Sequence, residues 1–300
     1  MKKDKKMIVA FMTPAIISLF IMFVYPVIRT IIMSFFNVES LTESTSSWSF
    51  AGLENYVKIW NAPSFRASMY NILRIWLVGG IIVLSLSLLF AVILTSGIRG
   101  KSFFRAAIYL PNVVSAVALA TMWIQYVFNK RHGLLNSFFA TLGFDSLAKT
   151  DWLSSDLKFW AMLAAFIFGA VGYYMLIFLS GIENIPQDYY EAATIDGASK
   201  LRQFTHITLP LLKGVMKTNL TFWSIHIITF FVWSKMFSPV DSESSTIAPV
   251  VYMMNIVFGS KGVTTRDAGA GAAVGVTLAL FVLVIFFVFN KLIKEEDVEY

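Results

Sequence analysis

Six long runs of hydrophobic residues divide the chain. They cover about residues 7–36, 72–94, 106–128, 159–181, 215–235 and 269–290. A helix that crosses a bilayer needs roughly 20 predominantly apolar residues. The runs are rich in Leu, Ile, Phe and Ala and lack the two-residue alternation of membrane barrel strands. The pattern therefore predicts an all-α integral membrane protein with six transmembrane helices in a single domain spanning residues 1–300.

The composition agrees with this prediction. Hydrophobic residues make up 57% of the 300 residues and charged residues only 14%, which is too apolar for a soluble domain of this length. The basic start and the first apolar run resemble a signal peptide, but the run continues to Phe36 without a small-residue cleavage site. We therefore expect a retained first span. The absence of cysteine excludes disulfides and thiolate ligands.

Basic residues predict the orientation. The segments between the apolar runs form two alternating sets, and the set 37–71, 129–158 and 236–268, taken together, has fewer basic residues per length than the other. The more basic set contains Lys2, Lys3, Lys5, Lys6, Arg99, Lys101, Arg105, Lys200, Arg202, Lys213, Lys217, Lys291 and Lys294. The positive-inside rule places both termini and the segment after the fourth span in the cytoplasm. The net charge of +6 then reflects topology and does not indicate nucleic-acid binding.

The segment 182–214, between the fourth and fifth spans, is polar and contains two short helical patterns. We expect helices at 187–195 and 199–206, separated by a turn in which Gly197 allows a positive φ. Ala192 and Ala193 leave a flat surface for close packing. Phe204 could fill a pocket of a partner. The residues alone equally allow an ordinary helix on the membrane surface, in which alanine serves helix propensity.

The order of residues in this segment resembles the coupling loop, or EAA loop, of permease subunits of ATP-binding-cassette importers. The matching residues are Glu191, Ala192, Ala193, Asp196, Gly197, Ala198, Phe204, Leu209 and Pro210. Further matches lie in the first span, at Pro14, Tyr25 and Pro26, and in the first outer loop, from Phe50 to Tyr56. Over nearly its whole length the chain is similar to carbohydrate-uptake permeases of the maltose type.

The resemblance implies a type I importer fold, with cytoplasmic coupling helices, in a bacterial or archaeal cytoplasmic membrane. It implies three kinds of protein partner: a second permease subunit in a heterodimer, two ATPase subunits and an extracytoplasmic solute-binding protein. ATP and Mg would bind the ATPase subunits, so this chain would be a transport subunit without enzymatic activity or a cofactor. Its function would be to translocate a sugar or oligosaccharide by alternating access.

The fifth run carries a polar and aromatic stripe. Its members are Asn219, Trp223, His226, Phe230 and Trp233, which are 4, 3, 4 and 3 residues apart. In a continuous helix this spacing places them on one face. Aromatic rings and hydrogen-bonding groups suit a carbohydrate pathway. A helix-packing face explains the stripe as well, and Trp233 also fits an outer aromatic belt.

The fourth run offers a companion face, at Phe166, Gly169, Ala170 and Tyr173, where small residues admit either a solute or a neighbouring helix. The resemblance implies that these two spans line the sugar cavity. The expected substrate pathway therefore comprises Tyr173 together with the stripe.

The sequence gives little support for nucleotide binding, metal binding or catalysis. The Gly-Lys-Ser at 100–102 resembles the end of a phosphate-binding loop, but Thr95 stands where that motif needs glycine. The three histidines lack ligand spacing, and no pattern indicates covalent or acid–base catalysis, so no metal or catalytic site is expected.

Three alternative functions remain. An importer of the same architecture could carry glycerol-phosphate-type or other polar solutes. A phosphate ester would require a strongly basic cavity, for which the sequence offers Lys217 and Lys235, near span ends. An ion-coupled secondary carrier would commonly hold a carboxylate in the membrane, and none of the six runs contains Asp or Glu. A membrane scaffold would leave the polar segment and the stripe without a purpose.

Overall fold

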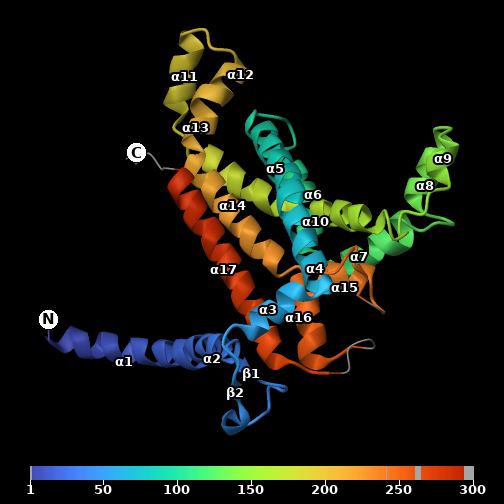
Figure 1. Cartoon of the computed structure of the whole chain (residues 1–300). Helices are drawn as coiled ribbons and strands as arrows, with labels where there is room; N and C mark the ends of the chain where they lie inside the picture. Colours follow the sequence, from blue (N-terminus) through green and yellow to red (C-terminus); the bar gives the residue numbers. More distant parts are fainter. Residues whose placement is uncertain (1, 241, 261–264, 294–300) are drawn as a thin grey trace. The chain divides into compact units, whose positions relative to one another are not determined.

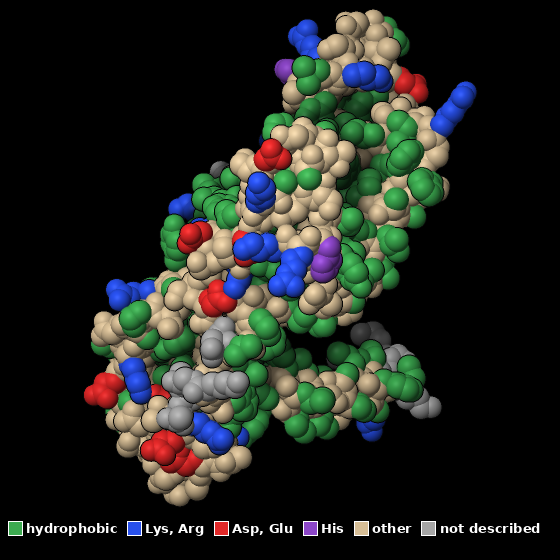
Figure 2. All heavy atoms as spheres, turned by 90° about the vertical axis from the view of Figure 1, so that its right-hand side faces the viewer, with side chains coloured by type: hydrophobic (Ala, Val, Ile, Leu, Met, Phe, Trp, Pro, Cys, Tyr) green, Lys and Arg blue, Asp and Glu red, His purple; other side chains and the backbone are tan. Residues whose placement is uncertain are grey.

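The computed structural model of the protein describes residues 2–240, 242–260 and 265–293, with side chains from Lys6 onward. Within this part, four helices are long and apolar enough to cross a membrane: Lys6–Met33, Pro63–Thr95, Lys158–Glu183 and Ala268–Leu292. A bent pair, Lys101–Val113 and Ala116–Val127, raises the number to five when it is taken as one span. Exposed hydrophobic side chains cover much of the face in Figure 2, as expected for a surface that meets lipid.

The chain divides into two compact units. The first contains residues 1–66 and 252–280, and the second contains residues 67–251 and 281–300. Three helices pass from one unit into the other: α4 (Pro63–Arg74), α16 (Pro249–Phe258) and α17 (Ala268–Leu292).

The first unit begins with a long helical segment (Figure 1). It consists of α1 (Lys2–Leu19), the π-helical turn η1 (Phe20–Val24) and α2 (Tyr25–Met33). The side chains of residues 6–23 are all exposed and mostly apolar, which suits a hydrocarbon environment. After α2 come β1 (Phe36–Asn37), η2 (Thr45–Ser47), β2 (Ser49–Phe50) and α3 (Glu54–Asn61), with β1 and β2 antiparallel.

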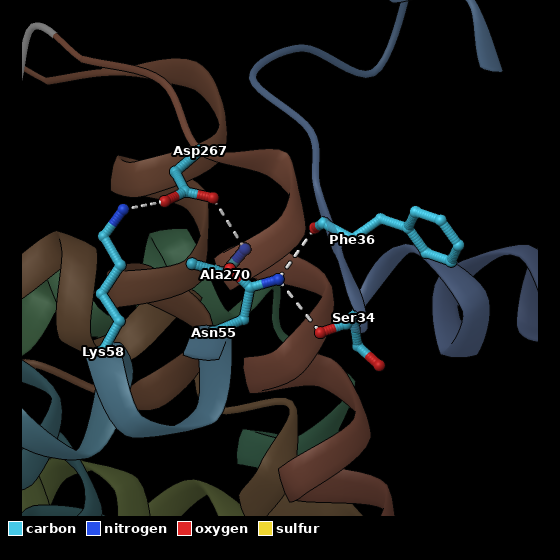
Figure 3. A network of polar contacts seen from close by, with 6 residues as sticks. All are labelled: Ser34, Phe36, Asn55, Lys58, Asp267 and Ala270. Carbon is cyan, nitrogen blue, oxygen red and sulfur yellow. Dashed lines mark hydrogen bonds and ion pairs between the residues drawn. The ribbon is translucent and has the colours of Figure 1, made fainter. Parts of the chain in front are cut away.

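A polar network fastens the segment 34–58 to the start of α17 (Figure 3). The buried Asn55 amide donates to the carbonyls of Ser34, at 3.0 Å, and Phe36, at 2.8 Å. Lys58 pairs with Asp267, and Asp267 accepts a 2.8 Å bond from the backbone N–H of Ala270. Asp267 therefore acts as the N-cap of α17. The network explains structurally why Asn55 stands in the motif of this loop.

The second unit contains the remaining helices. They are η3 (Ile75–Gly79), α5 (Gly80–Thr95), α6 (Lys101–Val113), α7 (Ala116–Met122), η4 (Trp123–Val127), α8 (Leu134–Thr141), α9 (Asp145–Ala148), α10 (Lys158–Glu183), α11 (Gln187–Ile195), α12 (Lys200–Gln203), η5 (Phe204–Thr208), α13 (Leu209–Leu211), α14 (Lys213–Ile228) and α15 (Val232–Phe237). α10 contacts α5, α6, α7, α14 and α15, so it is the central helix of this unit.

A reciprocal pair of tryptophan bonds joins η3 to α14. The Trp223 indole N–H donates to the carbonyl of Trp76 at 2.8 Å, and the Trp76 indole N–H donates to the Ser224 hydroxyl at 2.9 Å. Trp223 can approach so closely because Gly79 and Gly80 have no side chains. A Cβ added at Gly80 would lie 2.6 Å from Trp223 Nε1.

Two of the expected spans are interrupted. The third, expected as a continuous run over 106–128, bends by 98° between α6 and α7. Val114 and Ser115 are extended there, with ψ of 138° and 134°, so the helical hydrogen-bond ladder stops. Hydropathy does not register this bend, because the residues on both sides of it are apolar.

The fifth span, expected over 215–235, is divided into α14 and α15. The Thr229 hydroxyl donates to the carbonyl of His226 at 2.9 Å, and the Phe230 N–H bonds to Ile227 instead of continuing the α-helical ladder. Such local side-chain bonds compete with helix continuation. The stripe from Asn219 to Trp233 is therefore not carried by one helix.

We predict that Gly80→Val lowers the stability of the protein. The added side chain would collide with the Trp223 indole, and overpacking of this kind typically costs about 1–3 kcal/mol. The thermal midpoint of the detergent-solubilised protein, followed by fluorescence-detected size exclusion, measures the effect. Gly275→Ala is the control, because its added methyl would meet its nearest neighbours at 3.9 Å. An unchanged midpoint for Gly80→Val would contradict the packing role of this glycine.

Candidate functional site

The polar segment after α10 forms two short helical arms (Figure 1). The first arm, α11, spans Gln187–Ile195, which confirms the helix expected there. The chain turns away from this helix at Gly197, two residues after its end, where φ is +77°. Gly197 N–H bonds to the Thr194 carbonyl at 3.0 Å, and Ala198 N–H bonds to the Ala193 carbonyl at 2.8 Å. This is a Schellman C-cap, which favours glycine at the left-handed position.

The second arm continues farther than the sequence predicts. Ser199 caps α12 by accepting a bond from the N–H of Arg202, and the helical path runs on through η5 and α13 to Leu211. Pro210 therefore lies inside the helical path and does not end it at 206. The π-helical turn η5 directly precedes the proline, and a local change of helix type is one way to accommodate a missing N–H.

Side-chain bonds hold the two arms together. Gln203 is buried, and its amide donates to the Thr194 hydroxyl at 2.9 Å and to the Ala198 carbonyl at 3.3 Å. The hydroxyls of Tyr190 and Thr208 lie 2.9 Å apart and share a hydrogen bond. Because buried polar groups lose free energy when they lack partners, these bonds favour one fixed angle between the arms.

An ion pair connects the base of the segment to another helix. Lys101, the first residue of α6, lies 2.5 Å from Glu183, the last residue of α10. A hollow of about 760 Å³ lies between these helix ends and the arms. It is lined in part by Thr95, Lys101, Glu183, Tyr190, Lys200, Gln203, Phe204 and Thr208.

The outer surface of the arms presents most of the residues expected to couple. Glu191, Ala192, Asp196 and Gly197 are exposed, as are Leu209 and Pro210, whereas Ala193 and Ala198 are half-buried. Phe204 is also half-buried and lines the hollow, so it is less available to a partner than a surface anchor would be.

Two exposed apolar residues at the tip of the arms were missed from the sequence. Ile195 is 86% exposed and Leu201 is 73% exposed, on either side of the turn at Gly197. An isoleucine and a leucine in a polar segment are the signal that could have identified them. Their exposure provides an apolar contact surface beside Glu191 and Asp196.

In the second unit, the stripe residues gather around one ring of α10. The centroid of the Phe166 ring lies 5.7 Å from Trp223, 5.4 Å from His226, 4.9 Å from Phe230 and 5.7 Å from Trp233. Tertiary packing therefore reunites these four stripe residues although the helix that was expected to carry them is interrupted.

Burial separates the members of the stripe. Trp223, Phe230, Trp233 and Asn219 are buried within the chain, whereas His226 is exposed. The Asn219 amide has no hydrogen-bond partner for its oxygen or its nitrogen among the described residues. Only His226 of the five therefore reaches the surface of this chain to a large extent.

A buried tyrosine supports His226. The Tyr174 hydroxyl lies 3.2 Å from His226 Nδ1, and the Tyr174 ring is fully buried. Tyr173, the residue expected from the sequence, is 37% exposed and packs edge-on against Tyr174 with centroids 5.1 Å apart. The sequence pattern could not choose between the two tyrosines, because 7 and 8 residues after Phe166 both fit the helical period.

Among the described residues, no group of three or more His, Cys, Asp or Glu side chains could hold a metal ion. The two candidate regions are the pair of arms after α10 and the polar, aromatic face around Phe166.

A comparison with protein-family models matches residues 84–295 to the family described as binding-protein-dependent transport system inner membrane component. The arabinooligosaccharides transport system permease protein of Bacillus subtilis (strain 168) is 29% identical over 94% of this chain and 87% of its own length. The trehalose/maltose transport system permease protein of Thermococcus litoralis is 30% identical over 79% of this chain and 77% of its own length.

Two solved structures share the fold. One is a bacterial ABC transporter involved in the import of the acidic polysaccharide alginate, with a TM-score of 0.80 and 21% identity over 96% of this chain and 95% of that chain. The other is a bacterial alginate ABC transporter in complex with an alginate pentasaccharide-bound periplasmic protein, with a TM-score of 0.76 and 20% identity over 96% of this chain and 94% of that chain.

We predict that Gln203→Leu loosens the joint between the two arms. The leucine keeps a similar volume but removes the amide donor that the Thr194 hydroxyl and the Ala198 carbonyl share, and one such bond contributes about 0.5–1.5 kcal/mol. Hydrogen exchange of the amides at 194–203 should then become faster, with exchange in α10 unchanged. Arg202→Gln, at an exposed neighbouring position, serves as the control. Equal exchange in Gln203→Leu and the unaltered protein would show that this bond does not fix the arms.

Proposed function

Because the chain belongs to the family of binding-protein-dependent transport system inner membrane components, we propose that it is the permease subunit of an ATP-driven importer for a sugar or oligosaccharide. The observation that carries this proposal is the pair of rigid arms, which presents the expected coupling residues and an apolar tip on one exposed segment. The names of the similar permeases support the solute class.

We propose six membrane spans with both termini in the cytoplasm of a bacterial or archaeal cell. Four long apolar helices, the bent pair α6 and α7, and the divided pair α14 and α15 supply the six crossings. The positions of the basic residues support the orientation. Lys294 and the side chains of Lys2, Lys3 and Lys5 lie outside the described part of the chain.

The arms would dock on an ATPase subunit in the cytoplasm. Ile195 and Leu201 would fill an apolar groove, and Glu191 and Asp196 would meet basic groups around it. We propose two such ATPase subunits, which would bind ATP and Mg, and a second permease subunit in a heterodimer. Hydrolysis would then occur outside this chain, which would itself hold no cofactor.

An extracytoplasmic solute-binding protein is the remaining proposed partner. The description of the family names a binding-protein-dependent system, and one structural neighbour was solved with a periplasmic protein that carries an oligosaccharide. Such a protein would deliver the solute to the outer side of the permease pair.

The proposed pathway begins with His226 and Tyr173. A polar imidazole on the surface of an apolar helix is costly in lipid, so it favours contact with a water-filled cavity or another helix. Tyr174 orients the imidazole from behind. The buried Asn219, Trp223, Phe230 and Trp233 would hold α14 and α15 against α10 and so set the shape of the pathway without touching most of the solute.

We predict that Glu191→Lys and Gly197→Asp each abolish most coupled transport. The first reverses a docking charge, and the second forces a side chain into a left-handed backbone conformation that costs roughly 1–2 kcal/mol. Solute uptake by vesicles and ATPase recovery in a pull-down should both fall, with normal amounts of this chain in the membrane. Asp188→Lys, at an exposed position earlier in α11, tests whether any added charge has the same effect. Full uptake and ATPase binding by both coupling variants would refute the docking role.

We also predict that His226→Ala and Tyr173→Ala lower the uptake rate or change the range of solutes. Losing one hydrogen bond to a solute hydroxyl is worth about 0.5–1.5 kcal/mol, or up to roughly tenfold in uptake at low solute concentration. Ile225→Ala is a matched control, because Ile225 is an exposed apolar neighbour on α14. Wild-type rate and solute range in both variants would remove these two residues from the pathway.

A further inference from the structure

A group of aromatic rings surrounds one arginine near the start of two spans. Arg74 is the last residue of α4, and its guanidinium carbon lies 3.6 Å from the ring centroid of Phe159. The ring centroids of Trp160 and Tyr70 lie at 5.0 and 5.2 Å. Cation–π attraction to these rings therefore fixes the position of the guanidinium group.

The N–H edges of this guanidinium remain without an acceptor. Among the described residues, Arg74 has no hydrogen-bond or ion-pair partner, and the Tyr70 hydroxyl and the Trp160 indole N–H also lack one. The side chains of Tyr70 and Trp160 are exposed, and no side-chain nitrogen of Arg74 is both buried and unpaired among the described residues. The nearby Lys158, in the first turn of α10, pairs at 2.5 Å with Glu243 of the segment between α15 and α16, so that carboxylate is occupied. Arg74, Tyr70 and Trp160 thus form a donor-rich cluster that can bind acceptor oxygens from outside the described chain.

The position of the cluster indicates which oxygens these are. Trp160 lies in the first turn of α10, and Arg74, whose guanidinium carbon is 5.0 Å from the centroid of that ring, lies near the start of the apolar run 72–94 within the helix Pro63–Thr95. Tyr70 is 61% exposed and Trp160 is 48% exposed. Exposed tyrosine and tryptophan beside a span end are typical of the membrane interface, where lipid phosphates lie.

The exposed face of the helical segment around and after Arg74 is apolar, which suits contact with lipid acyl chains. Leu73, Leu77 and Ile81 are 47, 51 and 62% exposed along the same helical segment. Leu77 and Ile81 also line an open groove of about 320 Å³, whose other lining residues include Trp76, Leu84 and Leu220. A cationic, donor-rich cluster at the interface beside an apolar groove matches the two parts of a phospholipid.

We propose that Arg74, Tyr70 and Trp160 form a binding site for the phosphate of a phospholipid, whose acyl chains run along Leu77 and Ile81. The planar guanidinium would bind two phosphate oxygens at once, while the rings fix its orientation. In the topology proposed above, this site lies in the outer leaflet. Bound lipid would steady the ends of α4 and α10, next to Asn71, which holds the carbonyls of Ser244 and Ile247 at 2.8 and 3.0 Å.

Native mass spectrometry of the complex purified in mild detergent tests the proposal. The unaltered chain should retain a phospholipid that Arg74→Gln loses. Arg74→Lys, which keeps the charge without the planar fork, should retain it only at higher added phosphatidylglycerol. Arg105→Gln, an exposed arginine in another helix, should retain the lipid like the unaltered chain. An equal lipid complement in Arg74→Gln and the unaltered chain would overturn the proposal.

A second variant covers the case in which Arg74→Gln does not assemble. Tyr70→Phe combined with Trp160→Phe keeps aromatic faces around Arg74 and removes two donors, so weaker lipid retention is expected, and unchanged retention would contradict the proposal. Adding an oligouronate or inorganic phosphate to the purified complex tests whether the site binds one of these anions in place of a phospholipid. If added oligouronate displaces no lipid and Arg74→Gln loses oligouronate uptake, Arg74 lies on a solute path, and the lipid site is overturned. Counting lipids requires no transport assay, so failure here is separate from failure of the proposed importer function.

Discussion

The lack of hydrogen-bond partners in hydrocarbon is the constraint on which this structure depends. Every backbone polar group within a span must find a partner inside the protein, which is why the long apolar runs form helices. The same requirement governs contacts between spans. The Trp223 indole donates to the Trp76 carbonyl, and the Ser87 hydroxyl donates to the carbonyl of Val171 at 2.8 Å. Polar side chains buried among the helices are thus used to join them, and glycines allow the close approach.

The central helix α10 connects the two candidate regions. Its 26 residues correspond to a length of about 39 Å at 1.5 Å per residue. Phe166 and Tyr174 hold the aromatic cluster in its middle, and Glu183 at its end is paired with Lys101 just before the two arms. A displacement of the arms would therefore act directly on the helix that supports His226. This continuity gives a physical route by which ATPase closure could change the proposed pathway.

The interruptions of the helices are as informative as the helices themselves. The turn after Ile228 places Phe230 against the Phe166 ring, and Trp233 reaches the same ring from the separate short helix α15. The bend at residues 114 and 115 likewise separates α6 from α7, although both contact α10. Broken spans of this kind are tolerated where neighbouring helices satisfy the freed backbone groups. The short helices around α10 are consistent with that rule.

The sequence by itself determined the membrane environment, the helical class, the α11 helix and the turn at Gly197, because hydropathy and turn chemistry are local properties. It did not determine where the third and fifth spans break, since apolar residues continue through both breaks. It named Tyr173 but not Tyr174, and Phe204 but not Ile195, because periodicity cannot tell a buried face from an exposed one. Only the tertiary structure decided these points, since burial depends on which helix packs against which.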